Sequence, residues 1–514
     1  MKMKLYLLGM VVAAMASMTL CAGEARAASA RPVVLVSDLH VGAGHGRDGR
    51  WNNIEDFRWQ SDFNAFLDRI SAQAKDQADL VLLGDVFELW QSPSMECSTD
   101  LSKPSCKITD CKAPSKDLGC AEKDAVERLR LVLAQHGDFI AAIRAFAQKG
   151  RNTVVFVPGN HDAALLFPAV RKVLTDALQS SRVTVADGGY WVSPDGAVYA
   201  DHGHQFDELN KFSQWPKPFT KLGNVAYLQK AWGENMVQEF YNQYESVFPI
   251  IDNLSDEKSG VGYAVKQAGF PNSAEAVRRF FRFFLFQQSL NQANGFLSAD
   301  EKPVWNVAAV RKQPVDFFMD VFPASSRDAM RPAAFDPKEL SDAEIGALCE
   351  AKKTLEKARQ CPSLSGTLSA MAAGATSTPD MRLQGYLRTV LPAVAGSSPV
   401  VASAYVYGHT HAGSEKKPVT VDRLPHGPAD VLVANTGAFQ RTVTPAQIKR
   451  ILQRPQHVNK RALDLSPEDL PACYSFVWID PYGGREAIPE LRRWASKAGS
   501  PFEVSKGTCA SFTE

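Results

Sequence analysis

The sequence predicts an α/β fold, in which a layered core of short strands is combined with helices. Short apolar runs recur along the chain, and each stops abruptly at polar residues, as Pro32–Ser37 does before Asp38 and Leu80–Gly84 before Asp85. A helical pattern, such as that of Asp62–Lys75, separates these runs. Short runs rich in Val and Leu suit strands buried on both faces, and their alternation with helices indicates at least some parallel pairing.

Further strands and a second helix follow the same pattern later in the chain. The predicted strands are Thr153–Pro158, Val198–Ala200, Ala404–Tyr407, Asp430–Ala434 and Tyr474–Ile479, and the predicted helix is Glu122–Gln148. In folds of this kind, the residues that handle ligands gather at the carboxyl ends of the strands. The polar residues directly after each run are therefore candidates for a functional site.

Composition and charge exclude several classes of protein. The 514 residues include 57 Lys and Arg against 56 Asp and Glu, so the formal net charge is +1. This balance argues against a global electrostatic footprint for nucleic acid. With 45% hydrophobic and 22% charged residues, the composition is too ordinary for a disordered, collagen-like or coiled-coil protein, and the chain is long enough to bury a large core.

The first 27 residues are expected to be a signal peptide. Lys2 and Lys4 precede an apolar stretch from Leu5 to Leu20, and Ala25-Arg26-Ala27 provides a site of the A-x-A type, which predicts cleavage after Ala27. The alternative is an uncleaved membrane anchor, but the stretch is short for a span, which needs about 20 apolar residues. No later stretch is long and apolar enough to cross a bilayer, so we expect an exported chain, either periplasmic or extracellular.

Eight cysteines remain after the predicted cleavage, and an even number in an exported chain favours disulfides. Four of them fall between Cys97 and Cys120, in a loop over residues 91–122 that is rich in Lys, Ser, Pro and Asp. Their spacings of 9, 5 and 9 residues do not form the paired C-x₂-C knuckles of a zinc site. We therefore predict a surface loop stapled by disulfides, whose pairing the sequence leaves open.

A mainly helical insertion, or lid, is expected between two parts of the core. Strand-like runs are scarce over residues 206–398, whereas Asn235–Val247 and Ala274–Asn291 have helical patterns. The most aromatic segment, Phe280–Phe286, fits a helix in the core of a subdomain, and the alternative is a groove wall for an apolar part of a substrate. The mature chain then has a first core part, the insertion, and a second core part with a C-terminal extension, at residues 31–205, 206–398 and 399–514.

Five polar clusters directly follow predicted strands and carry residues that bind metals. They are Asp38-Leu39-His40, Gly84-Asp85, Gly159-Asn160-His161-Asp162, His202-Gly203-His204 and Gly408-His409-Thr410-His411, and they hold six of the ten histidines. Carboxylate, imidazole and amide oxygen without thiolate suit Mn²⁺, Fe, Zn²⁺ or Mg²⁺, and the number of groups exceeds what one four-coordinate zinc ion would use. In an extended segment, His409 and His411 project to the same side and can each serve one metal. The sequence therefore predicts two divalent metal ions.

In this order, the five clusters resemble the motifs of the calcineurin-like metallophosphoesterase superfamily, over residues 33–206 and 400–440. The resemblance implies a β-sandwich of two mixed sheets flanked by helices. It also implies a first metal held by Asp38, His40 and His411, a second metal held by Asn160, His202 and His409, and Asp85 as the bridge between the two.

The resemblance further implies phosphoester hydrolysis, in which a metal-bridging hydroxide attacks phosphorus and His161 protonates or stabilises the leaving oxygen. An imidazole with a supporting carboxylate suits that task, because the leaving oxygen gains negative charge. In the family this carboxylate lies three residues after the bridging aspartate, and here the position is Glu88, which is longer but has the same charge. Asp162 is a further catalytic candidate, with a structural loop carboxylate as the alternative. Three more polar residues stay open: His204, which either contacts substrate or orients a ligand, and His45 and Arg47, which fit a solvated loop better than a phosphate contact.

The run Gly84–Trp90 (G-D-V-F-E-L-W) also resembles, locally, the UDP-diacylglucosamine pyrophosphatases of lipid A synthesis. His161 stands where those enzymes typically have arginine, and the predicted signal peptide places the chain outside the cytoplasm. We therefore predict an exported, dinuclear metal-dependent phosphoesterase that hydrolyses a phosphate monoester or diester of a small substrate. The alternatives are a pyrophosphate hydrolase acting on a nucleotide-linked or lipid-like substrate, a non-catalytic binding protein on the same fold, and a structural cell-envelope protein.

Overall fold

The computed structural model describes residues 31–254 and 379–513, with gaps at 47, 99–104, 116–117, 208, 396–401, 425–426, 483–485 and 498–499. The predicted signal peptide, the predicted helix Ala274–Asn291 with its aromatic segment, and Arg47 lie outside the described residues. The boundaries of the insertion therefore stay a prediction.

A mixed sheet forms one layer of the core. Within the described ranges it has seven strands, in the order β17-β16-β15-β1-β2-β6-β7. The strands β1, β2, β6 and β7 pair in parallel, whereas β15 pairs antiparallel with both β1 and β16. The strands span Val33–Val36 (β1), Asp79–Leu83 (β2), Thr153–Val157 (β6), Val183–Val185 (β7), Cys473–Ile479 (β15), Glu490–Ala495 (β16) and Glu503–Lys506 (β17).

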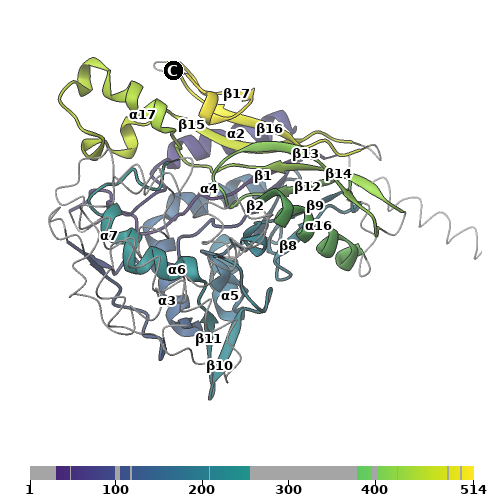
Figure 1. Cartoon of the computed structure of the whole chain (residues 1–514), viewed down its shortest axis with the longest axis horizontal. Coiled ribbons are helices and arrows are strands. Elements are labelled where there is room, and N and C mark those ends of the chain that lie inside the picture. Colours follow the sequence, from purple (N-terminus) through teal and green to yellow (C-terminus); the bar gives the residue numbers. More distant parts are fainter. Residues whose placement is uncertain are drawn as a thin grey trace, which may run out of the picture.

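A second mixed sheet forms the other layer. Its five strands within the same ranges have the order β13-β14-β12-β9-β8, and β12 pairs in parallel with both β14 and β9. Figure 1 shows the strands of both sheets close together in the centre of the molecule. The strands span Tyr190–Val192 (β8), Val198–Asp201 (β9), Ala404–Tyr407 (β12), Ser414–Val421 (β13) and Ala429–Asn435 (β14).

Alternate side chains of β1 enter two different cores. Val33 and Leu35 pack with Val198 and Val406 of the smaller sheet, so this core lies between the sheets. Val34 and Val36 belong to the larger core, together with apolar residues of the helices. Side chains on a strand alternate between its faces, which is why an uninterrupted apolar run is needed here. The predicted sandwich of two mixed sheets is confirmed.

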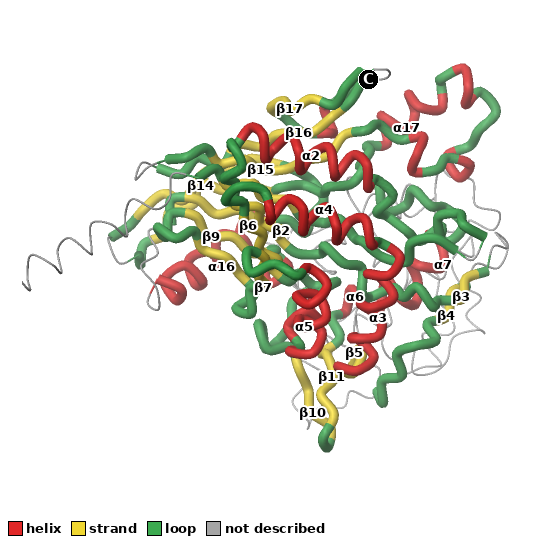
Figure 2. The backbone as a smooth tube through the Cα atoms, turned by 180° about the vertical axis from the view of Figure 1, so that it is seen from behind, coloured by secondary structure: helices red, strands yellow, loops and turns green. Residues whose placement is uncertain are grey.

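Helices cover the outer face of each sheet. On the larger sheet lie α2 (Gln60–Gln73), α4 (Gly137–Gln148) and α5 (Pro168–Leu178), with α3 (Glu122–Gln135) packed beside α5, and Figure 2 shows α2 and α4 in front of the strands. On the smaller sheet, α16 (Pro379–Ala395) packs through Leu383 and Leu387. The predicted helix Glu122–Gln148 is interrupted, because His136 has φ −118° and ψ 41° between α3 and α4.

The segment that follows the smaller sheet's first strands begins with a hairpin that we did not predict. Strands β10 (Phe219–Leu222) and β11 (Val225–Gln229) pair with each other, and β11 also pairs with β5 (Leu118–Ala121). A continuous helical stretch then runs through α6 (Trp232–Met236), a π-helical turn (Val237–Tyr241) and α7 (Asn242–Glu245). This stretch covers most of the predicted helix Asn235–Val247. Its apolar residues, such as Tyr244, pack against α17 (Pro445–Leu452).

Three disulfides join cysteines among the described residues. Cys97–Cys106 closes the short hairpin of β3 (Glu96–Cys97) and β4 (Cys106–Lys107), and Cys111–Cys120 ties the same loop to β5. Cys473–Cys509 fastens the C-terminal end of the chain to β15. The predicted disulfide-stapled loop is therefore present, with two local pairs.

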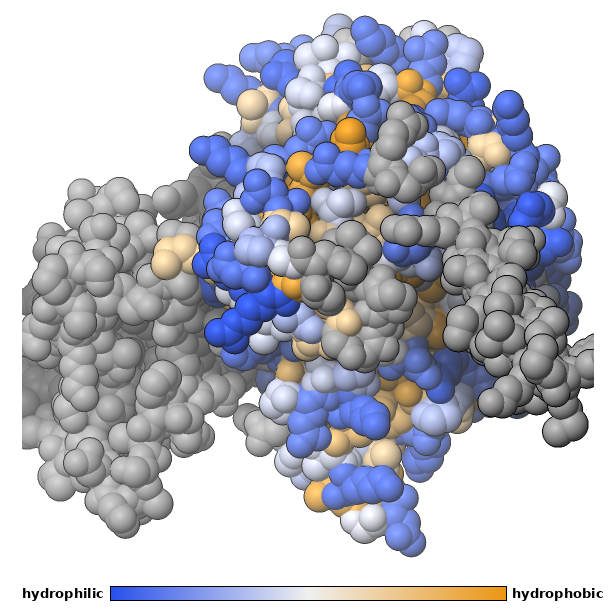
Figure 3. Space-filling view, turned by 90° about the vertical axis from the view of Figure 1, so that its right-hand side faces the viewer, coloured by the Kyte–Doolittle hydropathy of each residue, from blue (hydrophilic) through white to orange (hydrophobic). Residues whose placement is uncertain are grey.

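The surface of the described residues has no extended apolar belt on the face that Figure 3 shows, where hydrophobic side chains lie in small groups among hydrophilic ones. Among these residues, no helix combines the length and the hydropathy that crossing a membrane requires.

Candidate metal centre

The candidate ligands share one position in the fold, because each closely follows the carboxyl end of a strand. Three of these strands belong to the larger sheet and two to the smaller, and all five take part in parallel pairing. Side chains from distant parts of the sequence therefore come together at this edge. By strand, they are Asp38 and His40 (β1), Asp85 (β2), Asn160 (β6), His202 (β9), and His409 and His411 (β12).

Two groups of ligand atoms form at this edge. His202 links them, since its Nε2 lies 2.8 Å from Asp85 Oδ2 and 3.9 Å from Asp38 Oδ1. Six of the seven predicted ligands therefore lie in two adjacent groups that can each surround one cation. The members of each group have their ligand atoms within 4.8 Å of one another: Asp38, His40 and His411 in the first, and Asp85, His202 and His409 in the second.

Hydrogen bonds fix the ring orientation of three histidines. His202 Nδ1 lies 2.9 Å from the carbonyl oxygen of Leu83, and His40 Nδ1 lies 3.0 Å from Glu88 Oε2. These contacts leave Nε2 of both rings for a metal. His409 is turned the other way, because its Nε2 lies 3.0 Å from Asp207 Oδ2 and its Nδ1 is left for the metal. Partners of this kind set the tautomer and the orientation of metal-ligating histidines.

Two buried atoms indicate that the centre is built for cations. His40 Nε2 and Asn160 Oδ1 have no hydrogen-bond partner among the described residues, although the two residues are only 5% and 1% exposed. Asn160 belongs to the second group by position, since the next residue, His161, donates its backbone N–H to Asp85 Oδ1 at 2.8 Å. Buried polar atoms without a partner are rare and need an explanation, and a bound metal supplies one. The donors are carboxylates, imidazoles and an amide oxygen, a set that fits divalent transition metals or Mg²⁺.

The carboxylates of the centre favour the protonated form of His202, one of the candidate metal ligands. Burial raises the pKa of Asp85, but His202 and His161 outweigh this effect and keep the pKa well below its ordinary value. Burial lowers the pKa of His202, whereas Asp85 and Asp38 raise it, and the net result is a pKa of about 9. Without a metal, His202 is therefore protonated at neutral pH, and a metal has to displace that proton.

This competition predicts that metal affinity falls as the pH falls. His202 has a pKa of about 9, so at lower pH a metal ion must release its proton on binding. For each proton released, the apparent metal affinity should fall roughly tenfold for each unit by which the pH falls. Isothermal titration with Mn²⁺ at several pH values between 6 and 8, in buffers of different ionisation enthalpy, would measure both the affinity and the protons released. An affinity that does not change across this range would contradict the account.

The backbone at the strand ends adopts an uncommon conformation. Among the described residues, nine that are not glycine have positive φ angles, and five of these nine are predicted ligands. Such angles cost about 1–2 kcal/mol per residue and are found mostly where function requires them. The sharp turns bring side chains that leave separate strands into one centre. The five ligands are Asp38, His40, Asp85, His409 and His411, with φ between 50° and 69°.

Two glycines allow the loops of the centre to approach one another. A Cβ atom added to Gly159 would overlap the side chain of Asp85 and lie 2.6 Å from its backbone nitrogen. A Cβ atom on Gly408 would overlap Ser37 and lie 2.7 Å from Asp38 Oδ2. Real Cβ atoms do not come this close to other atoms, so any other residue at these positions must displace a candidate ligand.

We expect Gly159→Ala to displace Asp85 and to destabilise the fold by about 1–3 kcal/mol. Chemical denaturation would measure the change in the free energy of unfolding, and elemental analysis would measure the Mn²⁺ bound per chain, which should fall. Gly385→Ala is the matched control, because an added Cβ meets nothing within 4 Å there. Gly385 lies inside α16, so the control should be neutral or stabilising by about 0.5–1 kcal/mol. Unchanged metal content in Gly159→Ala would count against this view of the centre.

Glu88 joins the candidate acid His161 to the metal centre. Its Oε2 accepts hydrogen bonds from Nδ1 of both His40 and His161, and its Oε1 accepts from the backbone N–H of Trp90 and Gln91 at 2.7 and 3.0 Å. Burial raises the pKa of Glu88, but His161 and His40 outweigh it and hold the pKa far below its ordinary value. The ring of His161 is also stacked on Trp90, with 3.8 Å between the ring centroids. An ionised carboxylate thus orients an imidazole at the edge of the centre.

Asp162 has a different environment from that of the other catalytic candidates. Its side chain is fully buried and accepts hydrogen bonds from four backbone N–H groups, with Gly159 at 2.7 Å and Val86 at 2.9 Å as the shortest. These bonds tie the loop after β6 to the loop after β2. The contacts favour the structural alternative, in which Asp162 positions Asp85 and Asn160 and does not touch the reacting atoms.

The two other open histidines lie outside the ligand groups. His204 is buried against Trp215, with 4.4 Å between ring centroids, and burial together with His202 lowers its pKa well below the ordinary value. It is therefore a neutral, packed ring beside the second group. His45 is exposed and stacks on Trp51 at 3.7 Å, as expected for a loop residue.

Some contributors to the centre were not singled out in the sequence. Asp207, which contacts His409, is separated from it by 202 residues, so no local pattern connects them. Asn435 was visible as the polar residue after the apolar run Asp430–Ala434, and its side-chain amide donates to the carbonyl oxygen of Gly408 at 2.7 Å. The position of Asn435 at a strand end was thus a usable signal, whereas that of Asp207 was not.

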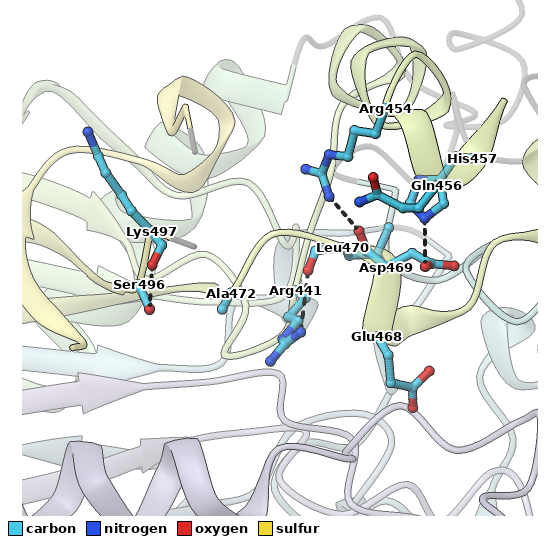
Figure 4. A pocket seen from close by; sticks show the side chains of 10 residues that line it. All are labelled: Arg441, Arg454, Gln456, His457, Glu468, Asp469, Leu470, Ala472, Ser496 and Lys497. Carbon is cyan, nitrogen blue, oxygen red and sulfur yellow. Dashed lines mark hydrogen bonds and ion pairs between the residues drawn. The ribbon is translucent and has the colours of Figure 1, made fainter. Parts of the chain in front are cut away.

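A cavity of about 300 Å³ lies in the C-terminal part of the chain (Figure 4). Within its lining His457 Nε2 lies 3.0 Å from Asp469 Oδ1, whereas Arg441 and Glu468 pair with Asp62 and Arg58, which do not line it. None of the candidate ligands lines it, so it is separate from the metal centre. Its walls are formed by Arg441, Arg454, Gln456, His457, Glu468, Asp469, Leu470, Ala472, Ser496 and Lys497.

Comparison with known proteins connects this architecture to one family. Residues 31–245 match the family model described as calcineurin-like phosphoesterase, a range that contains the first four motif clusters. A crystal structure of a dimetal phosphatase from Danio rerio is similar at 9% identity and a TM-score of 0.26, over 93% of this chain and 99% of that one. A likeness of that size carries no weight for the fold or the function. No curated protein matches the chain. Residues 31–245 therefore match the calcineurin-like phosphoesterase family, which confirms over this part of the chain the resemblance that the motif clusters predicted.

Proposed function

We propose that the chain is an exported hydrolase of phosphate monoesters or diesters that works with two divalent metal ions. The observation that carries this proposal is the meeting of candidate ligands from five strand ends, with His40 Nε2 and Asn160 Oδ1 buried and without hydrogen-bond partners among the described residues. Three disulfides in the described part of the chain support export, because such bonds persist in oxidising compartments.

Each candidate ligand is assigned to one or both of the two metal ions. When bound, two divalent ions neutralise the charge of a phosphate group and make water a better nucleophile at neutral pH. Asp85, a member of the second group with two carboxylate oxygens, is the residue that would hold both ions. The first ion is assigned to Asp38, His40 and His411, and the second to Asn160, His202 and His409.

His161 is the proposed proton donor to the leaving oxygen. Its Nδ1 is held by Glu88, so the ring presents Nε2 to the substrate side of the centre. The ionised Glu88 stabilises the protonated form of the ring, which keeps a proton available until the ester bond breaks. A substrate whose leaving oxygen is strongly basic needs this proton most.

The test of the proposed function uses the chain from Ala28 onward, loaded with Mn²⁺. Initial rates on a chromogenic phosphate monoester and on the matching diester are compared, each with and without a chelator. We expect hydrolysis that the chelator abolishes, and the ratio of the two rates assigns the chain to the phosphatases or the phosphodiesterases. Hydrolysis that survives the chelator would contradict the proposal. No hydrolysis of either ester, with two metal ions bound, would favour a pyrophosphatase or a binding protein.

A further inference from the structure

A second cluster of carboxylates lies near the metal centre but does not belong to it. Oxygen atoms of Asp56, Glu245 and Asp252 lie within 4.8 Å of one another. Asp56 belongs to the loop before α2, Glu245 is the last residue of α7, and Asp252 follows in the next turn. The cluster thus joins the helical stretch of α6 and α7 to the loop that follows the first motif.

Two carboxylates of this cluster, Asp56 and Glu245, are deeply buried. Among the described residues, no lysine or arginine forms an ion pair with Asp56 or Glu245, which are 4% and 0% exposed. Arg58, which is close to Asp56 in sequence, pairs instead with Glu468 at 3.2 Å. Buried carboxylates of this kind must either take up protons or bind a cation.

An independent observation points to a ligand. Gln91 is 2% exposed, and its Nε2 donates to Glu245 Oε2 at 2.7 Å, which places its amide group at the cluster. The other atom of that amide, Oε1, has no hydrogen-bond partner in the described part of the chain, and neither has Glu245 Oε1. A buried amide oxygen and a buried carboxylate oxygen can therefore both coordinate a cation.

We infer that Asp56, Glu245, Asp252 and Gln91 hold a third divalent cation, of the Ca²⁺ type. Carboxylate and amide oxygens without imidazole suit a hard cation, and Ca²⁺ takes six to eight such ligands in flexible geometry. The two histidine-containing groups suit transition metals, so the chain sorts two kinds of metal by donor type.

The geometry gives the third cation a structural task. The side chain of Gln91 contacts Glu245, and its backbone N–H donates to Glu88, which orients His161. A cation in the cluster would therefore stabilise the position of Gln91 and, through Glu88, that of the proposed acid His161. Burial and the neighbouring Asp252 raise the pKa of Asp56 and Glu245, so the cluster tolerates its charges poorly without a cation.

The inference does not depend on the proposed function, because metal content is measured and not turnover. The full chain from Ala28 is stripped with a chelator, refilled with two equivalents of Mn²⁺, and dialysed against excess Ca²⁺. Elemental analysis should then find two Mn²⁺ and one Ca²⁺ per chain, and Ca²⁺ should raise the melting temperature. A wild-type chain that keeps two Mn²⁺ and binds no Ca²⁺ would overturn the inference and leave protons as the occupants of the cluster.

Glu245→Gln tests the assignment of the ligands. The substitution keeps the shape of the side chain and removes one charge, so Ca²⁺ affinity should fall by about tenfold or more while both Mn²⁺ ions stay. Glu127→Gln on α3 is the matched control, because the Glu127 side chain is 67% exposed and pairs only with the exposed Arg130. If Glu245→Gln does not fold, the partly exposed Asp252→Asn should show the same selective loss. The inference of a separate third site would be overturned if Glu245→Gln bound Ca²⁺ as tightly as the wild type. It would also be overturned if Glu245→Gln and Asp252→Asn each lost Mn²⁺ together with Ca²⁺.

Discussion

Replacing Asp85 with asparagine is expected to lower kcat/KM for phosphoester hydrolysis on the order of 10³-fold or more. Asp85 belongs to the second ligand group, with Oδ2 2.8 Å from His202 Nε2 and Oδ1 accepting from the backbone N–H of His161. An amide has nearly the same shape, so it keeps the packing, but it lacks the negative charge that two adjacent cations need between them. The variant should bind fewer than two Mn²⁺ ions per chain.

The control for this substitution is Asp187→Asn. The side chain of Asp187 is 80% exposed, and its one ion pair among the described residues is with Arg171, at 3.7 Å. Both variants are compared by their initial rates and by elemental analysis of bound Mn²⁺. Wild-type activity in Asp85→Asn, with two ions still bound, would remove Asp85 from the bridging position and with it the proposed arrangement of the ligands.

Replacing His161 with asparagine is expected to lower kcat by about 10²–10⁴-fold, the usual contribution of a general acid. Unlike Asp85→Asn, this variant should keep both Mn²⁺ ions. Atoms of His161, His40 and Glu88 also form a close group, but the contacts within it are the hydrogen bonds of the two rings to Glu88 Oε2. We therefore expect His161 to act on the substrate and not to hold a metal.

The choice of leaving group distinguishes a proton donor from a residue with a merely structural role. An ester of an acidic phenol needs little protonation, so His161→Asn should reduce its hydrolysis least. An ester of an alkyl alcohol should lose the most, and Glu88→Gln should show a weaker form of the same pattern. Equal losses for all leaving groups, or loss of a metal ion from His161→Asn, would rule out the proton-donor role.

Much of the core and of the metal centre could be predicted because both depend on local patterns. A strand buried on both faces needs an apolar run, and a ligand at its carboxyl end needs a polar residue directly after that run. Both signals are present at Asp38 after β1 and at Asp85 after β2. The close approach of the loops also requires glycine, which explains Gly159 and Gly408 within the motifs.

What could not be predicted depends on contacts between distant segments. The helix expected over Glu122–Gln148 breaks at His136, whose ring contacts Glu55 at 3.3 Å, so a tertiary contact accompanies the break. The hairpin of β10 and β11 was missed although Gly223-Asn224 between two strand-like runs is a two-residue turn signal. Its pairing with β5, more than 100 residues earlier, is a contact between distant segments. The carboxylates Asp56, Glu245 and Asp252 likewise meet only in the folded chain.

The left-handed backbone conformation of the candidate ligands could not be predicted from the sequence either. Aspartate and histidine adopt positive φ more readily than most residues do, but their identity alone does not predict that conformation. At His409 and His411 the turn after β12 is required to send the two side chains to different groups. The extended segment expected over His409–His411 is wrong, because both residues have positive φ, although the two rings still lie in one group each, as predicted.

The central claim is that two metal ions lie side by side at the carboxyl ends of strands from both sheets. Anomalous diffraction from crystals loaded with Mn²⁺ tests it most directly. The account predicts two peaks about 3.5–4 Å apart, one beside Asp38, His40 and His411 and the other beside Asn160, His202 and His409, with Asp85 touching both. A single peak in this region, or a pair of peaks that these side chains do not contact, would contradict it.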